Sequence, residues 1–102
     1  MTESEFTQKT DAIFTRIENA FDDSDIECGR NGAVLEIEFD DGSQIIINRH
    51  APTQEIWLAA KSGGFHYGFQ DGQWLSKRDN SELFGKLSEL IKLGCEEIVK
   101  FS

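Results

Sequence analysis

The pattern that most constrains the fold is a strict alternation of apolar and charged side chains over residues 34–39. Leu35, Ile37 and Phe39 fall on one side of an extended chain, and the two intervening glutamates fall on the other. The next three residues, Asp40-Asp41-Gly42, form a strong hairpin signal. The sequence therefore predicts an antiparallel sheet with one face against a core and the other toward water.

Further strands are predicted at residues 25–28, 44–49, 54–60, 65–69 and 74–75, with turns at residues 30–32, 61–64 and 71–72 and a loop at residues 50–53. In the strand over residues 54–60, period-2 geometry places Ile56 and Leu58 inward and Glu55 and Trp57 outward. In the first strand, Ile26 and Cys28 point inward.

A helix is predicted from Thr2 to about Asp22. Thr2 and Glu5 have the spacing of a capping box. Apolar side chains recur on one face at helical intervals: Phe6, Ile13, Ile17, Ala20 and Phe21. On roughly the opposite face lie Asp11, Glu18 and Asp22, and we expect Asp11 to be a solvated surface residue.

A second helix is predicted near the C-terminus. Asp79 and Glu82 have capping-box spacing, with Asp79 in the N-cap position. The apolar stripe of this helix is Leu83, Phe84, Leu87, Leu90 and Ile91. Gly94 is expected to end it, and residues 98–101 form a short, extended tail.

The order of elements is helix, five or six antiparallel strands, helix. A chain of 102 residues with this order is expected to form one domain over residues 1–102. The predicted fold class is α+β, a two-layer sandwich with both helices on one face of the antiparallel sheet.

Composition and motifs argue against several function classes. A pI near 4.5 disfavours nucleic acid as a partner. The sequence contains neither an apolar run long enough to span a bilayer nor the features of a signal peptide, so we expect a cytoplasmic protein. It lacks the motifs of a nucleophilic enzyme or a nucleotide-binding protein. His50 and His66 have no obvious partner and are expected to be structural, Cys28 is expected to be a core thiol, and the protein is expected not to be an enzyme.

Negative charge is concentrated in the first part of the chain. Residues 1–41 hold twelve of the nineteen acidic residues and only three basic ones, so the whole formal charge of −9 belongs to them. The acids that gather around the end of the first helix are Glu18, Asp22, Asp23, Asp25 and Glu27, which we call the acidic ridge.

The acidic ridge does not match a closed metal site. Asp23, Asp25 and Glu27 have the 1-3-5 spacing of an EF-hand, but Cys28 and Val34 stand where that loop needs Gly and Glu. A zinc site would need cysteine or histidine ligands among these acids. What remains is an open row of hard oxygen ligands, suited to iron, manganese, calcium or magnesium.

The position of the acidic ridge opposes the helix dipole. Asp22 and Asp23 lie at the negative C-terminal end of the first helix, where cations are preferred. Each misplaced charge costs about 0.3–1 kcal/mol. Since unfavourable local choices often mark functional sites, the ridge is a candidate binding surface.

A second candidate surface lies on the open face of the sheet. Trp57 is predicted to point outward. In the neighbouring strand, Asn48 and Ile46 lie on the same side of the chain, and this side is predicted to point outward as well. An exposed tryptophan in such a patch indicates a protein interface. The alternative is that Trp57 packs beneath a loop, or that the other face is the buried one.

The chain resembles the frataxin family, in its bacterial form. The resemblance rests on Ile46-Ile47-Asn48-Arg49-His50-Ala51-Pro52, Ile56-Trp57-Leu58-Ala59 and Gly63-Gly64, with further matches at Ser4-Glu5-Phe6, Ser24-Asp25-Ile26-Glu27-Cys28 and Asn31-Gly32. The C-terminal helix also falls in place. The chain departs from the family at His50 and Glu55, where glutamines are common.

This resemblance implies an iron-binding protein of iron–sulfur cluster assembly that contacts the cysteine desulfurase and modulates its activity. It implies that the acidic ridge binds iron (Fe2+ or Fe3+) weakly and docks on basic desulfurase residues. It also implies sheet-surface contacts at Asn48 and Trp57, with the iron–sulfur scaffold protein as a further partner. A monomer that can oligomerise with iron is expected.

Two other functions remain open. One is a metal-independent adaptor that binds a partner through the sheet face around Trp57. The other is a weak ferroxidase or iron-storage activity.

Overall fold

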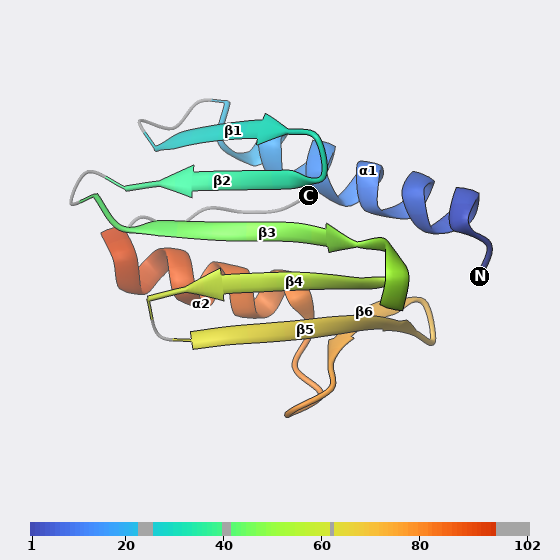
Figure 1. The fold of residues 1–102 in the computed structure, drawn as a ribbon. Coiled ribbons are helices and arrows are strands. Elements are labelled where there is room, and N and C mark those ends of the chain that lie inside the picture. The colour runs from blue at the N-terminus through green and yellow to red at the C-terminus, as the bar shows by residue number, and fades with distance from the viewer. Residues whose placement is uncertain (23–25, 40–41, 62, 96–102) are drawn as a thin grey trace.

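The computed structural model describes residues 1–22, 26–39, 42–61 and 63–95, with side chains to residue 92. Its elements in chain order are α1 (Glu3–Ala20), β1 (Glu27–Asn31), β2 (Val34–Glu38), β3 (Gln44–His50), the 3-10 helix η1 (Ala51–Thr53), β4 (Glu55–Ala60), β5 (Gly63–Gln70), β6 (Gln73–Ser76) and α2 (Leu83–Cys95). Figure 1 shows them along the chain.

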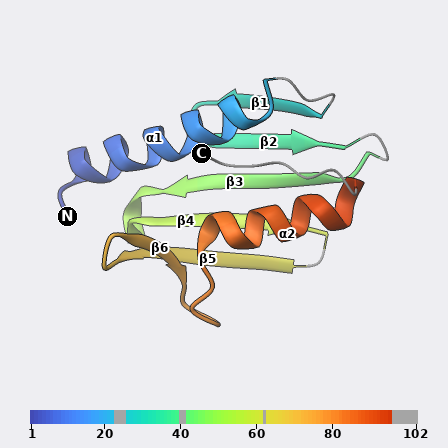
Figure 2. The same cartoon turned by 180° about the vertical axis from the view of Figure 1, so that it is seen from behind.

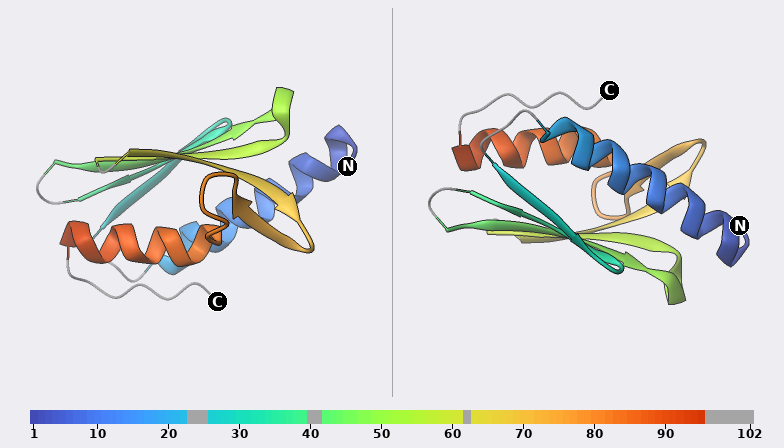
Figure 3. Two further views of the ribbon diagram at one scale, coloured as in Figure 1. Left: turned by 90° about the horizontal axis from the view of Figure 1, so that it is seen from below. Right: turned by 90° about the horizontal axis from the view of Figure 1, so that it is seen from above.

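The six strands form one antiparallel sheet in the order β1-β2-β3-β4-β5-β6, so each strand pairs with its neighbour in sequence. Figure 3 shows α1 and α2 in one layer on the same face of this sheet, and Figure 2 shows both from behind. The predicted two-layer α+β sandwich is therefore confirmed, with six strands. Within the described ranges, neither helix is long and apolar enough to cross a membrane.

Alternation along the strands separates a buried face from an open one. The core between sheet and helices is made of Leu35, Ile37, Ile45, Ile47, Ile56, Leu58 and Tyr67 from the strands and of Phe6, Phe14, Ile17, Leu83, Leu87 and Ile91 from the helices, with others at its rim. Burying each such side chain contributes on the order of 1.5–3 kcal/mol. The open face and the edges of the sheet are thus left for contacts with other molecules.

The start of α1 matches the prediction. Thr2 Oγ1 accepts from the Glu5 N–H (3.1 Å) and the Glu5 carboxylate accepts from the Thr2 N–H (3.3 Å), which is a capping box. The buried face of α1 differs from the predicted one because it includes Thr10 and Phe14, whereas Ile13 is only partly buried. Thr10 is tolerated there because its hydroxyl donates to the Phe6 carbonyl (2.9 Å).

The first hairpin lies later in the chain than predicted. The strand predicted at residues 25–28 is β1, which runs to Asn31, and the turn consists of Gly32 and Ala33. Gly32 has a φ of 62°, which favours glycine. Because the turn has only two residues, the ladder between β1 and β2 continues up to the pair Asn31–Val34. Of the turn predicted at residues 40–42, Asp40 and Asp41 lie outside the described residues.

The predicted cap of α2 is wrong in one respect. The helix begins at Leu83, and Glu82 takes the capping role because its carboxylate accepts from the Gly85 N–H (3.0 Å). Asp79 instead accepts from the N–H and the hydroxyl of Ser81. Glu82 also forms a bridge to Leu75, which delays the start of the helix. The tail at residues 98–101 lies outside the described residues.

Candidate functional site

The described part of the acidic ridge follows the C-terminal end of α1 into β1 (Figure 1). Glu18 lies in the last turns of α1, Asp22 follows the C-cap residue Phe21, and Glu27 begins β1. Asp22 and Glu27 are exposed, and Glu18 is partly exposed. Asp23 and Asp25 lie outside the described residues, so their predicted place in the ridge remains a prediction.

Two observations describe the electrostatics at the C-terminal end of α1. The last turn of α1 carries no basic residue, so its acids face the negative end of the helix dipole. Burial, together with the negative charges of Glu18 and Asp22, raises the pKa of the Cys28 thiol to about 11. Cys28 is thus protonated at neutral pH and half-buried against the core, as the sequence predicted, and it is unsuited to be a nucleophile or a soft-metal ligand.

The Asp11 side chain is substantially exposed to solvent, as the sequence predicted, but it is also ion-paired, which the sequence did not show. Its carboxylate accepts from Arg49 Nη1 (2.5 Å) and is also paired with Arg30. The hydrogen bond from Arg49 holds the pKa of Asp11 below its usual value. Both guanidinium groups also lie over the Phe14 ring. Asp11 therefore ties α1 to the sheet.

Glu18 is partly neutralised by the same arginine cluster. Arg30 Nη1 lies 3.5 Å from the Glu18 carboxylate, a long contact with both side chains substantially exposed. Such a pair contributes little to stability and opens easily. Glu18 therefore remains available as a ligand, but a cation that binds it competes with Arg30.

The acidic surface extends beyond the residues that the sequence assigned to it. In the β1–β2 ladder Glu27 stands directly opposite Glu38, and like charges in such a pair repel. Glu36 projects on the same face, and a hollow of about 560 Å³ lies there, lined by Glu27, Cys28, Gly29, Arg30, Asn31, Glu36 and Glu38. Strand alternation in the sequence already indicates that Glu36 and Glu38 point outward. Only the register of β1 and β2 in the structure places Glu38 opposite Glu27.

Within the described ranges, no three His, Cys, Asp or Glu side chains lie close enough together to hold a metal ion. The described acids therefore form an open surface of oxygen ligands. Such a surface attracts hard cations or a basic protein surface.

The open face of the sheet around Trp57 differs from the predicted patch. Trp57 is outward and half-buried beside Asn48, its partner in β3. Its two ring faces are covered by His50 (centroids 3.9 Å apart) and His66 (4.5 Å), both nearly parallel to the indole. The histidines therefore have a partner that the sequence did not show, and this packing agrees with the structural role predicted for them.

Glu55 was predicted to point outward, and it does, but it is only 6% exposed. Its carboxylate accepts from Thr53 Oγ1 (2.7 Å) and Trp57 Nε1 (3.0 Å) and lies 2.5 Å from Lys77 Nζ. His50 Nδ1 is hydrogen-bonded to Thr53 Oγ1 (2.8 Å) and so completes the cluster. Four members of this group lie within residues 50–57, but the sequence does not show that Lys77, twenty residues beyond Trp57, joins it.

Comparison with known proteins places the chain in a family. The model of the frataxin-like domain matches residues 1–97. The chain belongs to the frataxin-like family. The predicted resemblance is therefore confirmed.

Curated relatives of this frataxin-like chain carry the name iron–sulfur cluster assembly protein CyaY. One from Neisseria meningitidis serogroup A is 46% identical, with 100% of this chain and 97% of the relative covered. One from Janthinobacterium sp. is 51% identical, with 89% of this chain and 88% of the relative covered.

Solved structures agree with the frataxin-like fold. Frataxin from Psychromonas ingrahamii superposes with a TM-score of 0.94 at 35% identity, over 100% of this chain and 99% of that chain. The trimeric frataxin of the yeast Saccharomyces cerevisiae gives 0.65 at 26% identity, over 91% of this chain and 80% of that chain.

Proposed function

We propose that this chain is a non-enzymatic, iron-binding protein of iron–sulfur cluster assembly in the bacterial cytoplasm. In this proposal the acidic ridge binds iron weakly and also docks on basic residues of the cysteine desulfurase, so that the chain modulates cluster formation. The names of the CyaY relatives support the pathway. The observation that carries the proposal is the pairing of Glu27 with Glu38 across β1 and β2, together with the acids Glu18 and Asp22 at the end of α1, where no basic residue lies in the last turn.

The mechanism follows from electrostatics. Carboxylates at the negative end of α1 and across the Glu27–Glu38 pair repel one another until a cation or a basic surface neutralises them. Hard oxygen ligands suit iron, and the open arrangement leaves coordination positions free for water or for a partner. Iron and the desulfurase therefore either compete for the ridge or share it through a bridging ion.

Titration with ferrous iron under anaerobic conditions, followed by NMR, tests the metal part of this proposal. Amide signals of residues 18–27 should shift or broaden first, followed by Glu36 and Glu38. Glu89 on α2 is a matched acid outside the ridge, and its signal should be unaffected. Effects that begin at His50 or His66 would contradict the assignment.

Charge reversal tests the docking part. A variant with Asp22→Lys, Asp23→Lys, Asp25→Lys and Glu27→Lys should lose binding to the desulfurase. The control Glu89→Lys changes one charge on α2 and should bind as the wild type does. Unchanged affinity of the fourfold variant would exclude the ridge as the docking surface.

A second candidate is a metal-independent adaptor acting through the sheet face. The half-buried Trp57 beside Asn48 favours it, and the scaffold protein is the partner to test. Trp57→Ala should then abolish that binding while iron uptake by the ridge remains. If Trp57→Ala also lost iron uptake, the sheet face and the acidic ridge would not be two separate binding surfaces.

Iron-dependent oligomerisation and ferroxidase activity form a third, weaker candidate. The yeast relative is trimeric, and we propose a monomer that assembles only when iron is added. Size-exclusion chromatography and oxygen consumption with and without iron test this. An unchanged monomer without oxygen consumption would dismiss it.

A further inference from the structure

A pocket lined by basic side chains lies toward the opposite edge of the sheet from the acidic ridge. It has a volume of about 280 Å³ and is lined by Gly64, Phe65, His66, Lys77 and Arg78. Three of these five residues are basic and none is acidic, in a chain whose formal charge is −9. Since β1 and β5 are separated by three strands, this pocket is independent of the ridge.

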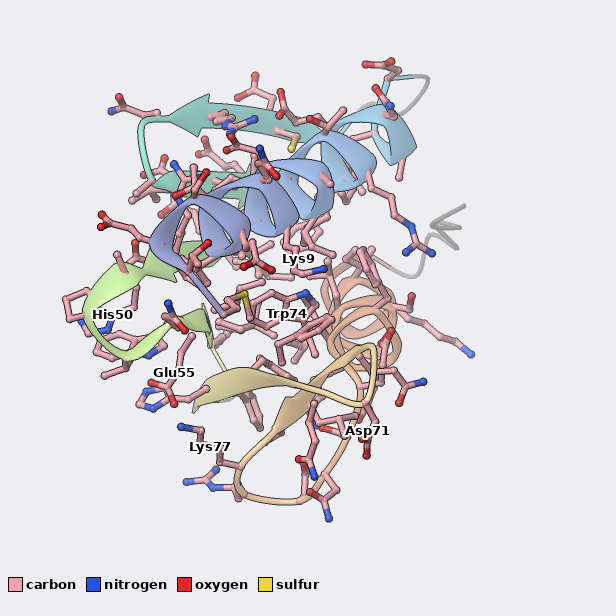
Figure 4. All side chains as sticks on the ribbon, turned by 90° about the vertical axis from the view of Figure 1, so that its right-hand side faces the viewer. Lys9, His50, Glu55, Asp71, Trp74 and Lys77 are labelled. Carbon is pink, nitrogen blue, oxygen red and sulfur yellow. The ribbon has the colours of Figure 1, made fainter. Side chains whose placement is uncertain are left out.

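Lys77 is held at the pocket by the buried Glu55. Figure 4 shows Glu55 between His50 and Lys77. Glu55 accepts three interactions, from Thr53, Trp57 and Lys77, so its carboxylate is fixed. The Lys77 side chain remains 64% exposed, and an ammonium has three N–H donors, so further donors are free for a ligand. The positive charge of Lys77, however, is balanced by the negative charge of Glu55.

Arg78 supplies the permanent positive charge of the pocket. Among the described residues, no carboxylate lies within ion-pair distance of its guanidinium, which lies over the Phe65 ring, 5.8 Å from the ring centroid. Lys86 lies over the same ring at 4.8 Å and is paired with Glu89 (3.7 Å). A planar guanidinium beside a ring is well suited to bind a carboxylate with two hydrogen bonds.

His66 adds an exposed imidazole to the lining of the pocket. Its exposed ring is stacked on Trp57, which holds the imidazole at the mouth of the pocket. The charged groups of the pocket are Lys77, which is paired with Glu55, and Arg78.

The strand edge beside the pocket is open within the described residues. β6 pairs with β5 from Tyr67 to Gln70, and the Lys77 N–H donates to the His66 carbonyl (3.1 Å). The ladder with β6 ends there, so on the β6 side no described strand lies beside Gly64 and Phe65, which pair with β4 on their other side. An extended chain that entered here could use these main-chain groups.

We propose that this pocket binds an acidic side chain on an extended segment of a protein partner. Arg78 and Lys77 donate to the carboxylate, His66 lines the same pocket, and Phe65 packs against the carbon chain of the bound residue. The open edge and the apolar Phe65 favour a peptide over a small inorganic anion. The site does not depend on iron or on the ridge.

The test is an NMR titration of the full chain, without iron, using the capped peptide acetyl-Gly-Ser-Glu-Glu-Ser-Gly-amide. The matched probe has Gln in place of both Glu residues. The glutamate peptide should shift signals of residues 64–66, 77 and 78, and the glutamine peptide should not. Equal shifts with both peptides, or shifts confined to other regions, would overturn the proposal.

Single substitutions test which side chains of the pocket bind the glutamate peptide. Arg78→Ala should weaken binding at least about threefold, whereas Lys92→Ala removes an exposed charge of α2 and should have no such effect. Dispersed spectra of each variant establish that it is folded.

A final control separates peptide from anion. Sodium acetate at the same carboxylate concentration should give much smaller shifts. If acetate binds as well as the glutamate peptide and with the same dependence on Arg78, the pocket is a small-anion site and the peptide proposal fails.

Discussion

The carboxylate of Glu55 lies 2.5 Å from the ammonium group of Lys77 and is nearly inaccessible to water, although it projects from the open face of the sheet. Burial alone would raise the pKa of Glu55. The hydrogen bonds from Lys77, Trp57 and Thr53 outweigh burial and lower it to about 2. The charged form of Glu55 is thus strongly favoured in the folded protein.

This relationship predicts a loss of stability in acid. Because the folded-state pKa lies below the usual value of 4.5, the contribution of Glu55 is fully present above about pH 4.5 and is lost as the pH falls toward 2. Since one pKa unit corresponds to about 1.4 kcal/mol, this contribution is roughly 3 kcal/mol. Urea unfolding at several pH values should show that Glu55→Gln is less stable than the wild type at pH 7 and that the difference shrinks in acid. A constant difference would contradict the assigned pKa.

The cluster around Asp11 predicts a clear cost for its removal. Asp11→Ala should lower the free energy of unfolding by about 1 kcal/mol, because Arg30 and Arg49 both lose their shared carboxylate. The exposure of Asp11 limits the effect through solvent screening. Gln8→Ala, at an exposed position of the same helix, is the control for urea unfolding. An equal change in both variants would mean that the arginine contacts contribute nothing.

Charge reversal at the end of α1 predicts the opposite sign. Asp22→Lys should raise the free energy of unfolding by about 0.3–1 kcal/mol, because a cation suits the negative end of the helix dipole. Asp22→Asn should give a smaller gain, and salt should reduce both gains. Thermal unfolding at low and high ionic strength measures them. Destabilisation by Asp22→Lys would refute the idea that the ridge is maintained at a cost to the fold.

Tyr67 predicts a stabilising substitution in the core. Its hydroxyl is fully buried and has no hydrogen bond of good geometry among the described residues, although the Ser81 hydroxyl lies close enough to interact with it. A buried hydroxyl without a partner costs about 1–3 kcal/mol. Tyr67→Phe should therefore leave stability unchanged or raise it by up to about 1 kcal/mol in urea unfolding. A marked loss would reveal an interaction of the hydroxyl within the folded protein.

Local patterns were sufficient for most of the fold. The alternation over residues 34–39 and the capping box at Thr2 and Glu5 depend on contacts close in sequence, and both are found in the structure. Where neighbouring elements compete, the prediction was less accurate. The bridge between Leu75 and Glu82 moved the start of α2, and the two-residue turn at Gly32 and Ala33 lengthened β1.

The sequence by itself determined the antiparallel sheet with two helices, the concentration of negative charge before residue 42, and the family to which the chain belongs. These are properties of spacing and composition. Only the tertiary structure decided which charges are paired, because pairing depends on side chains brought together from distant segments. It joined Asp11 to Arg30 and Arg49, placed Glu38 opposite Glu27, and buried Glu55 beneath Trp57 and Lys77.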